Sequence, residues 1–166
     1  MSEDLKPPLL RMSLVFLMRG EQILLAMKRR GFGQGLYNGV GGKVQAGESI
    51  IEAATRECME EVKVKPLILN PIAKLTFINQ GQSDNLVFAF SCDKWEGTPS
   101  NSEEMRPKWF NLSTIPYDKM WECDSYWIPR VLANEKITGV FYFDNQDRLL
   151  DYHIDAHSRL DLASLN

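Results

Sequence analysis

The stretch GKVQAGESIIEAATRECMEEVKV, residues 42–64, decides the fold class, because a glycine-containing loop runs directly into a segment with helical periodicity. On a helical projection of about 100° per residue, the apolar side chains form one stripe, made of Ile50, Ile51, Ala54, Cys58 and Val62. We therefore predict a helix from about Ser49 to Lys63, punctuated by Pro66, with this stripe packed on the core.

Three glutamates of this helix, Glu57, Glu60 and Glu61, project to the margin of the apolar stripe, whereas Arg56 and Lys63 are expected to point outward. Like charges three or four residues apart cost roughly 0.2–0.5 kcal/mol per pair at a surface, and more when partly buried. A hard cation such as Mg²⁺ would remove this repulsion, because carboxylate oxygens are its preferred ligands. The alternative is an ordinary acidic helix surface, which three glutamates indicate in most other contexts.

The loop before the helix favours the metal site over the acidic surface. Seven of the eleven glycines fall between residues 31 and 47, so this segment is expected to be a loop. Gly41, Gly42 and Gly47 allow the backbone to approach a phosphate closely, and Glu48 lies where the loop enters the helix. Together they predict an element that binds phosphate and metal.

The spacing of six residues in this element resembles the Nudix box: a glycine, five residues, a glutamate, seven residues, then Arg-Glu, an apolar residue, any residue, and Glu-Glu. The matching residues are Gly42, Glu48, Arg56, Glu57, Glu60 and Glu61. Cys58 fills the apolar position, and Lys63 departs from the pattern, which has glycine there. The resemblance implies an α/β (α+β) fold, the Nudix α/β/α sandwich with a mixed β-sheet. We expect one domain over residues 1–166, with the box at 42–64.

The resemblance also implies a pyrophosphohydrolase, in which water attacks a phosphorus of a nucleoside diphosphate linked to another group. Mg²⁺, or Mn²⁺ in its place, would lower the pKa of a bound water and neutralise phosphate charge. Arg56 would orient a glutamate by a charge-assisted hydrogen bond. Glu57 joins Arg56 and Glu61 in the catalytic set; the sequence leaves open which glutamate takes the proton, and Glu61 is our choice. The implied metal ligands are Gly41, through its carbonyl, and Glu57, Glu60, Glu61 and Glu104.

Four further stretches closely resemble the oxidised purine nucleoside triphosphate hydrolases (8-oxo-dGTP diphosphatases), the animal homologues of bacterial MutT. They are MKRRGFGQGLYNGVGGKVQAGE (27–48), GTPSNSEEMRPKWF (97–110), IPYDKMW (115–121) and DSYWIP (124–129). By position, Asn38 and Asp124 would hydrogen-bond the purine edge, Phe77 and Trp121 would enclose the ring, and Phe32 would line the pocket. The other implied substrate-binding residues are Ser13, Lys28, Gly42, Lys43 and Cys123.

Each base-recognition residue also has a structural explanation. Phe77 and Trp121 fit an ordinary aromatic core, and Asn38 fits a turn stabilised by its own side chain. Asp124 fits the N-cap of a following helix. Lys28 and Glu104 fit solvated positions at a strand end and in a polar loop.

Cys123 is the sharpest departure from this group, whose pattern has two consecutive aspartates where this chain has Cys123-Asp124. A thiol is a weak donor and a weak acceptor, so it does not replace the hydrogen bonding of a carboxyl group. We therefore predict an altered preference among 8-oxo-dGTP, 2-hydroxy-dATP and alkylated guanine nucleotides.

Composition limits the other function classes. The chain has 166 residues, 44% of them hydrophobic, which suits one domain with a buried core. A formal net charge of −3 leaves no basic field for a long nucleic acid, so a small-molecule nucleotide is the expected partner. The start MSEDLKPPLL lacks the features of a secretory signal, and the longest apolar run, 14–18, is far below the roughly 20 residues of a membrane span. Three widely spaced cysteines fit reduced thiols, so we expect a cytoplasmic protein without a membrane partner. We expect a monomer, although the sequence does not give the oligomeric state.

The remaining elements are expected from runs of apolar and β-favouring residues. Hairpins are predicted from 12–18 and 22–27, from 67–79 and 85–92, and from 140–143 and 148–152. A further strand is predicted at 106–112 and a second helix at 124–134.

Two other functions compete with hydrolysis of oxidised purine nucleotides. The first is a Nudix pyrophosphohydrolase acting on a dinucleoside polyphosphate, ADP-ribose or a methylguanosine cap. The second is a non-catalytic Nudix domain that senses nucleotides, which would be expected to have lost carboxylates of the box. This chain retains all of them.

Overall fold

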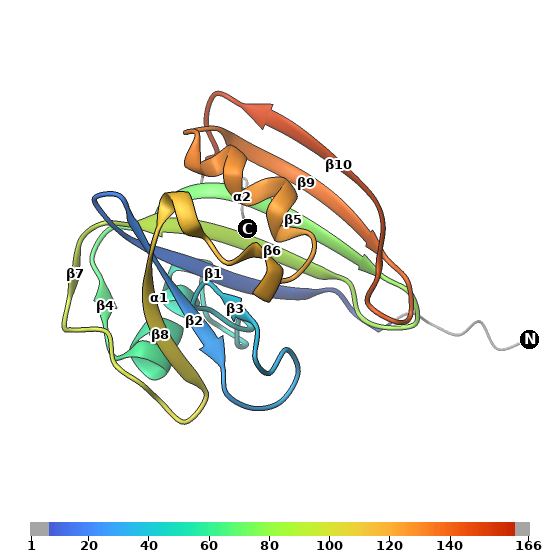
Figure 1. The fold of residues 1–166 in the computed structure, drawn as a ribbon. Coiled ribbons are helices and arrows are strands. Elements are labelled where there is room, and N and C mark those ends of the chain that lie inside the picture. The colour runs from blue at the N-terminus through green and yellow to red at the C-terminus, as the bar shows by residue number, and fades with distance from the viewer. Residues whose placement is uncertain (1–6, 162–166) are drawn as a thin grey trace, which may run out of the picture.

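A strongly twisted mixed β-sheet forms the body of the molecule in this computed structural model, which describes residues 7–161 (Figure 1). The strand order is β10-β9-β5-β6-β1-β2-β3, and β8 pairs with β2. These strands are β1 (Leu10–Arg19), β2 (Gln22–Lys28), β3 (Tyr37–Asn38), β5 (Asn70–Asn79), β6 (Asn85–Cys92), β8 (Met105–Asn111), β9 (Lys136–Phe143) and β10 (Leu149–His157). A separate two-stranded pair joins β4 (Lys65–Pro66) to β7 (Trp95–Glu96). Residues 1–6, on which the expected lack of a secretory signal partly rests, and 162–166 lie outside the described residues.

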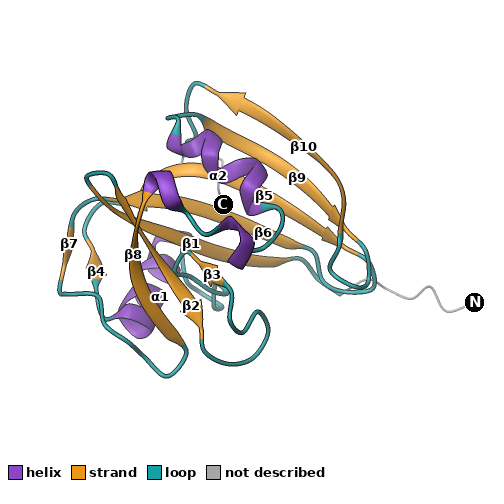
Figure 2. Ribbon diagram, viewed as in Figure 1, coloured by secondary structure: helices purple, strands orange, loops and turns teal. Residues whose placement is uncertain are grey.

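Two helices cover opposite faces of the sheet: α1 (Ile50–Val62) and α2 (Asp124–Leu132) (Figure 2). Strand β1 contributes to the core on both faces, because its successive side chains alternate between them. Val15 and Leu17 join the core cluster that includes the apolar side of α1, whereas Leu14 and Phe16 join the cluster beneath α2. The predicted mixed sheet flanked by helices is confirmed. No helix within residues 7–161 combines the length and the apolar character needed to cross a membrane.

The ends of α1 lie at the predicted residues because both have capping geometry. Ser49 is the N-cap, and its side chain and that of Glu52 form a capping box. Lys63 is the C-cap, with a left-handed backbone at φ 65°. A residue with a Cβ is strained in this conformation and glycine is not. The departure of Lys63 from the Nudix box therefore falls at the helix exit, outside the carboxylate cluster.

Replacing Lys63 by glycine should raise the free energy of unfolding by about 0.5–1 kcal/mol, because relief of left-handed strain outweighs the added entropy of the unfolded chain. Urea unfolding followed by circular dichroism measures the change. Lys65→Gly is the matched control, since Lys65 lies in a strand and lacks positive φ, and this substitution should destabilise. A Lys63→Gly protein no more stable than the wild type would contradict the explanation.

Several predicted boundaries differ from the structure. The strand predicted from Leu67 begins only at Asn70, because Leu67 instead pairs its backbone with Lys94. The last hairpin is longer than predicted, and its ladder continues to the pair Lys136 and His157. Most of β10 is exposed, so it carries no alternating apolar pattern that would reveal its length. The second helix ends at Leu132, short of the predicted Asn134.

Candidate active site

A cavity of about 280 Å³ opens between the sheet and the start of α2. Its floor comes from three consecutive residues of β1, from alternate residues of β2, β5 and β6 and from Phe143 of β9, and its other wall comes from residues around Asp124. The size is close to the lower end of small-ligand sites, roughly 300 Å³. All predicted substrate-binding residues except Lys43 line it, namely Ser13, Lys28, Phe32, Asn38, Gly42, Phe77, Trp121, Cys123 and Asp124.

Asp124 brings a buried carboxyl group to this cavity. Its residue is only 4% exposed, and burial raises the pKa of its carboxyl to about 7. One oxygen, Oδ1, accepts a hydrogen bond from Trp127 Nε1 at 3.0 Å and a long contact from Cys123 Sγ at 3.8 Å. The other oxygen, Oδ2, has no hydrogen-bond partner within the described chain. The N-cap explanation of Asp124 is wrong, because Cys123 occupies the cap and Asp124 begins the helix.

Two more polar side chains face the same space. Ser13 is 2% exposed, and its hydroxyl lacks a partner among residues 7–161. Asn38 lies in β3 and not in a turn, so the turn explanation is wrong. Its Oδ1 accepts a hydrogen bond from the Gly39 N–H at 2.8 Å, which leaves its amide NH₂ for another partner. Buried polar groups without partners are costly, so the cavity is built to receive hydrogen bonds from a ligand.

Aromatic rings border the cavity on two sides. Phe32 stacks on Trp121 with centroids 5.1 Å apart, although Phe32 is 70% exposed. Phe77 packs against Phe141 and Phe143, with centroids at 5.6 and 5.8 Å. Phe77 is therefore both a core residue and a pocket wall, so the two explanations of this residue do not exclude each other.

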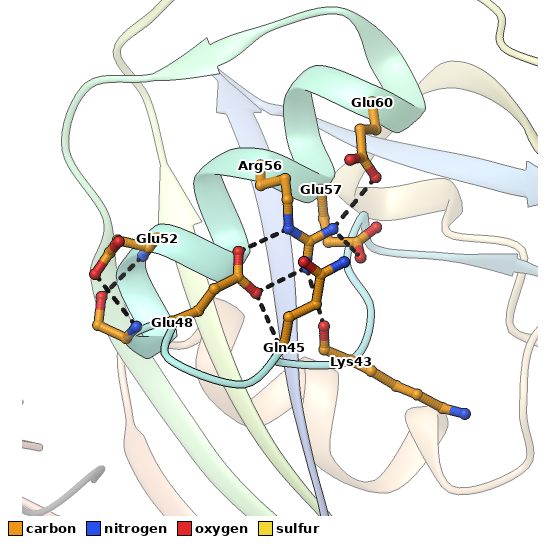
Figure 3. A network of polar contacts seen from close by, with 8 residues as sticks. Lys43, Gln45, Glu48, Glu52, Arg56, Glu57 and Glu60 are labelled. Carbon is orange, nitrogen blue, oxygen red and sulfur yellow. Dashed lines mark hydrogen bonds and ion pairs between the residues drawn. The ribbon is translucent and has the colours of Figure 1, made fainter.

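The guanidinium of Arg56 lies at the centre of the Nudix-box contacts (Figure 3). It pairs with Glu48 through Nε at 2.7 Å and Nη2 at 3.0 Å, and Nη1 contacts Glu57 at 2.9 Å and Glu60 at 3.2 Å. Nη2 also donates to the carbonyl of Lys43 at 3.1 Å. The expectation that Arg56 points outward is wrong, because the acidic side chains draw it back along the helix. Arg56 in turn lowers the pKa of the Glu48 carboxyl, and the carboxylates raise that of Arg56.

Glu61 is the most buried carboxylate of the box, at 7% exposure. Its Oε2 accepts a hydrogen bond from the Gly41 N–H at 3.3 Å. Burial, and then the negative charge of Glu57, raise the pKa of Glu61 to about 8. The glycine loop lies directly over this pair, since a Cβ added to Gly42 would come within 2.6 Å of Glu57 Oε1.

The Glu57 and Glu61 pair fits a divalent cation, because Mg²⁺ needs only one or two carboxylates when substrate phosphates complete its shell. Glu60 is more exposed and turns toward Arg56, and Glu104 contacts Arg30 at 3.6 Å, outside the cavity lining. Within the described part of the chain, no three acidic, histidine or cysteine side chains are grouped to hold a metal. Participation of Glu60, Glu104 and the Gly41 carbonyl therefore stays a prediction. The Lys43 side chain extends away from the network (Figure 3).

The cavity also contains residues that the sequence did not single out. Asn79, Asn85 and Asp147 add polar groups at its end near Phe143, and Met12, Leu14 and Val87 add apolar floor. The signal for Asn85 was present, because it falls on the same face as Val87 in an alternating strand. A polar residue at such a position is unusual and indicates either a partner or a ligand.

The comparisons with known proteins agree with this geometry. The NUDIX domain family matches residues 8–131. The chain is 43% identical over 143 residues to an oxidized purine nucleoside triphosphate hydrolase of Mus musculus, covering 86% of this chain and 92% of the relative. A protein of the same name from Danio rerio is 39% identical over 145 residues, or 87% and 93% of the two chains. The solved mMutator MutT protein from Bacillus halodurans superposes with a TM-score of 0.78 at 25% identity, over 88% and 97% of the two chains. The chain therefore belongs to the Nudix family.

Proposed function

We propose that this protein is an Mg²⁺-dependent pyrophosphohydrolase that converts oxidised purine nucleoside triphosphates to the monophosphate and pyrophosphate. One observation carries the proposal: an aromatic-walled cavity with unpartnered buried polar atoms on Ser13 and Asp124 adjoins the Glu57 and Glu61 pair. The aromatic walls suit a planar base, and the polar atoms suit its edge. The names of the mouse and zebrafish relatives support the same substrate class.

The chemistry assigns separate tasks to the residues of the box. Glu57 and Glu61 would hold the divalent cation, which neutralises phosphate charge and activates water when bound. Arg56 fixes Glu57 and Glu48 by charge-assisted hydrogen bonds, and the Gly41 N–H fixes Glu61. We assign Glu61 as the base: the water oxygen bonds to phosphorus, its proton passes to Glu61, and pyrophosphate leaves with the electrons of the broken P–O bond.

Net charge and the state of the cysteines indicate the size of the substrate and the cellular compartment. The net charge of −3 favours a free nucleotide over a long nucleic acid. The cysteines Cys58, Cys92 and Cys123 are buried free thiols, which fits a reducing compartment. We therefore infer a cytoplasmic protein that acts on the nucleotide pool, and we propose that it does so as a monomer.

The decisive assay compares dGTP with 8-oxo-dGTP, and dATP with 2-hydroxy-dATP, by following pyrophosphate release in Mg²⁺. The oxidised member of at least one pair should have the higher kcat/KM, and a metal chelator should abolish turnover. Equal kcat/KM values within both pairs would overturn the substrate assignment. Activity on only ADP-ribose, a dinucleoside polyphosphate or a methylguanosine cap would show that the protein has the substrate of another Nudix class.

Cys123→Asp should change the substrate ratios by about tenfold, because a neutral thiol is replaced by a second hydrogen-bonding carboxyl group beside Asp124. The thiol is neutral since burial, and then the negative charge of Asp124, raise its pKa. The measurement is kcat/KM for 8-oxo-dGTP, 2-hydroxy-dATP and an O⁶-alkylated dGTP. Cys92→Ala, a buried thiol outside the cavity lining, is the control. Unchanged ratios in Cys123→Asp would remove Cys123 from base selection.

A further inference from the structure

Two asparagine side chains interrupt the apolar floor of the cavity. Asn79 of β5 and Asn85 of β6 line it together with Phe77 and Val87. Asn85 lies directly opposite Phe77 in the ladder between the two strands. It alternates with Val87, whose side chain belongs to the core cluster beneath α2, so Asn85 projects to the same face.

The two carboxamides differ in their partners. Asn79 Nδ2 donates a hydrogen bond to the Ser83 carbonyl at 2.9 Å, so this side chain is fixed by the loop that follows its strand. The Asn85 carboxamide makes no hydrogen bond to another residue within 7–161, although the residue is half-buried between β1 and β5. A partly buried amide among apolar neighbours is unfavourable unless it finds a partner. Asn85 is therefore positioned to receive a group from the ligand.

Asn85 and Asn38 line the cavity from two different strands, β6 and β3. The chain directly after β3, which carries Asn38, bridges to β1 between Val40 and Val15, so β1 alone lies between that segment and β6, which carries Asn85. Neighbouring strands are about 4.8 Å apart, so the segment after β3 and β6 are separated by about 10 Å across the sheet. That spacing suits a planar bicyclic base whose two opposite edges are both hydrogen-bonded.

We propose that Asn85 is a specificity-determining residue that binds the oxidised edge of an 8-oxopurine, an inference that rests on the proposed function. An 8-oxopurine has an N–H at position 7 next to a carbonyl at position 8. A carboxamide complements this pair, because Oδ1 accepts from the N–H while Nδ2 donates to the carbonyl. An unmodified purine has only a lone pair at N7 and a C–H at position 8, so it offers Asn85 one hydrogen bond. The second hydrogen bond distinguishes the oxidised base.

The substitution Asn85→Leu tests this assignment by removing both hydrogen-bonding groups at similar volume. It should lower the kcat/KM ratio of 8-oxo-dGTP to dGTP by about tenfold, the discrimination expected from one well-formed bidentate pair. The ratio of 2-hydroxy-dATP to dATP should stay unchanged, since their edges at N7 and C8 are identical. In metal-free protein, the affinity for 8-oxo-dGMP should fall relative to dGMP by a similar factor. This binding measurement is independent of turnover.

Asn70→Leu is the matched control, because Asn70 is an exposed residue at the opposite end of the same strand pair, and it should leave every ratio unchanged. Asn85→Asp keeps the shape and removes the donor, so it should also lose the preference for 8-oxo-dGTP. If Asn85→Leu lowers kcat/KM equally for oxidised and normal nucleotides, or lowers neither, the role of Asn85 is overturned and the proposed function is not. A wild-type protein without any preference for oxidised purines would instead overturn the proposed function.

Discussion

Replacing Glu61 by glutamine should lower kcat by roughly 10²–10⁴-fold while the fold survives, because glutamine keeps the shape of the side chain and removes its proton-accepting and cation-binding charge. The Gly41 N–H can still donate to the glutamine oxygen, so the glycine loop keeps its anchor. Steady-state turnover of 8-oxo-dGTP and circular dichroism provide the two measurements. Unchanged turnover would remove Glu61 from the mechanism.

The same substitution should change how stability depends on pH. The Glu61 carboxyl has a pKa of about 8 in the folded protein, against an ordinary value of 4.5. The metal-free protein should therefore lose stability as the pH rises from about 4.5 to 8, because in this range the unfolded chain has released the Glu61 proton and the folded protein still holds it. Glu61→Gln should be more stable than the wild type at pH 8, and the difference should shrink below pH 4.5. Glu52→Gln, an exposed change at a capping-box position that tolerates glutamine, should alter neither kcat nor this pH dependence.

Replacing Gly41 by alanine should destabilise the protein by more than about 3 kcal/mol and abolish activity, because the new Cβ would overlap the carbonyl oxygen and carbon of Ser13 in β1. Backbone atoms of a central strand have little freedom to move, so the loop would have to detach from β1. That displacement would also break the contact between the Gly41 N–H and Glu61. Thermal unfolding and turnover measure both consequences.

Gly47→Ala is the matched control for this loop. Gly47 has φ +82°, and a Cβ added there would have no neighbouring atom within 4 Å, so alanine adds backbone strain of about 1 kcal/mol and no overlap. If Gly41→Ala is no less stable than Gly47→Ala, the backbone of β1 at Ser13 moves at little cost and the predicted overlap is wrong.

The sequence predicts the parts of this molecule that depend on local chemistry. The bounds of α1 follow from the capping residue Ser49 and from the end of its apolar stripe, and the structure confirms them. The cavity contains nearly all the residues expected from the resemblance, because aligned motifs preserve position in the fold. The direction of Arg56 was mispredicted, since a helical projection ignores the attraction of Glu48 from the preceding loop. Asn85 was missed although it shares a strand face with Val87, because the sequence does not show that this face lines the cavity beside Phe77.

The central position of β1 has a mechanical consequence. Its Ser13 N–H donates to the Gly42 carbonyl at 2.9 Å and its Met12 bridges to Lys43, while Met12, Ser13 and Leu14 also line the base cavity. One strand thus contributes floor to the base cavity and holds the glycine loop that lies over the Glu57 and Glu61 pair. Because both contacts are made by one strand, we expect the separation between the cavity floor and the glycine loop to be fixed, and ligands whose ring-to-diphosphate distance matches this separation to be favoured.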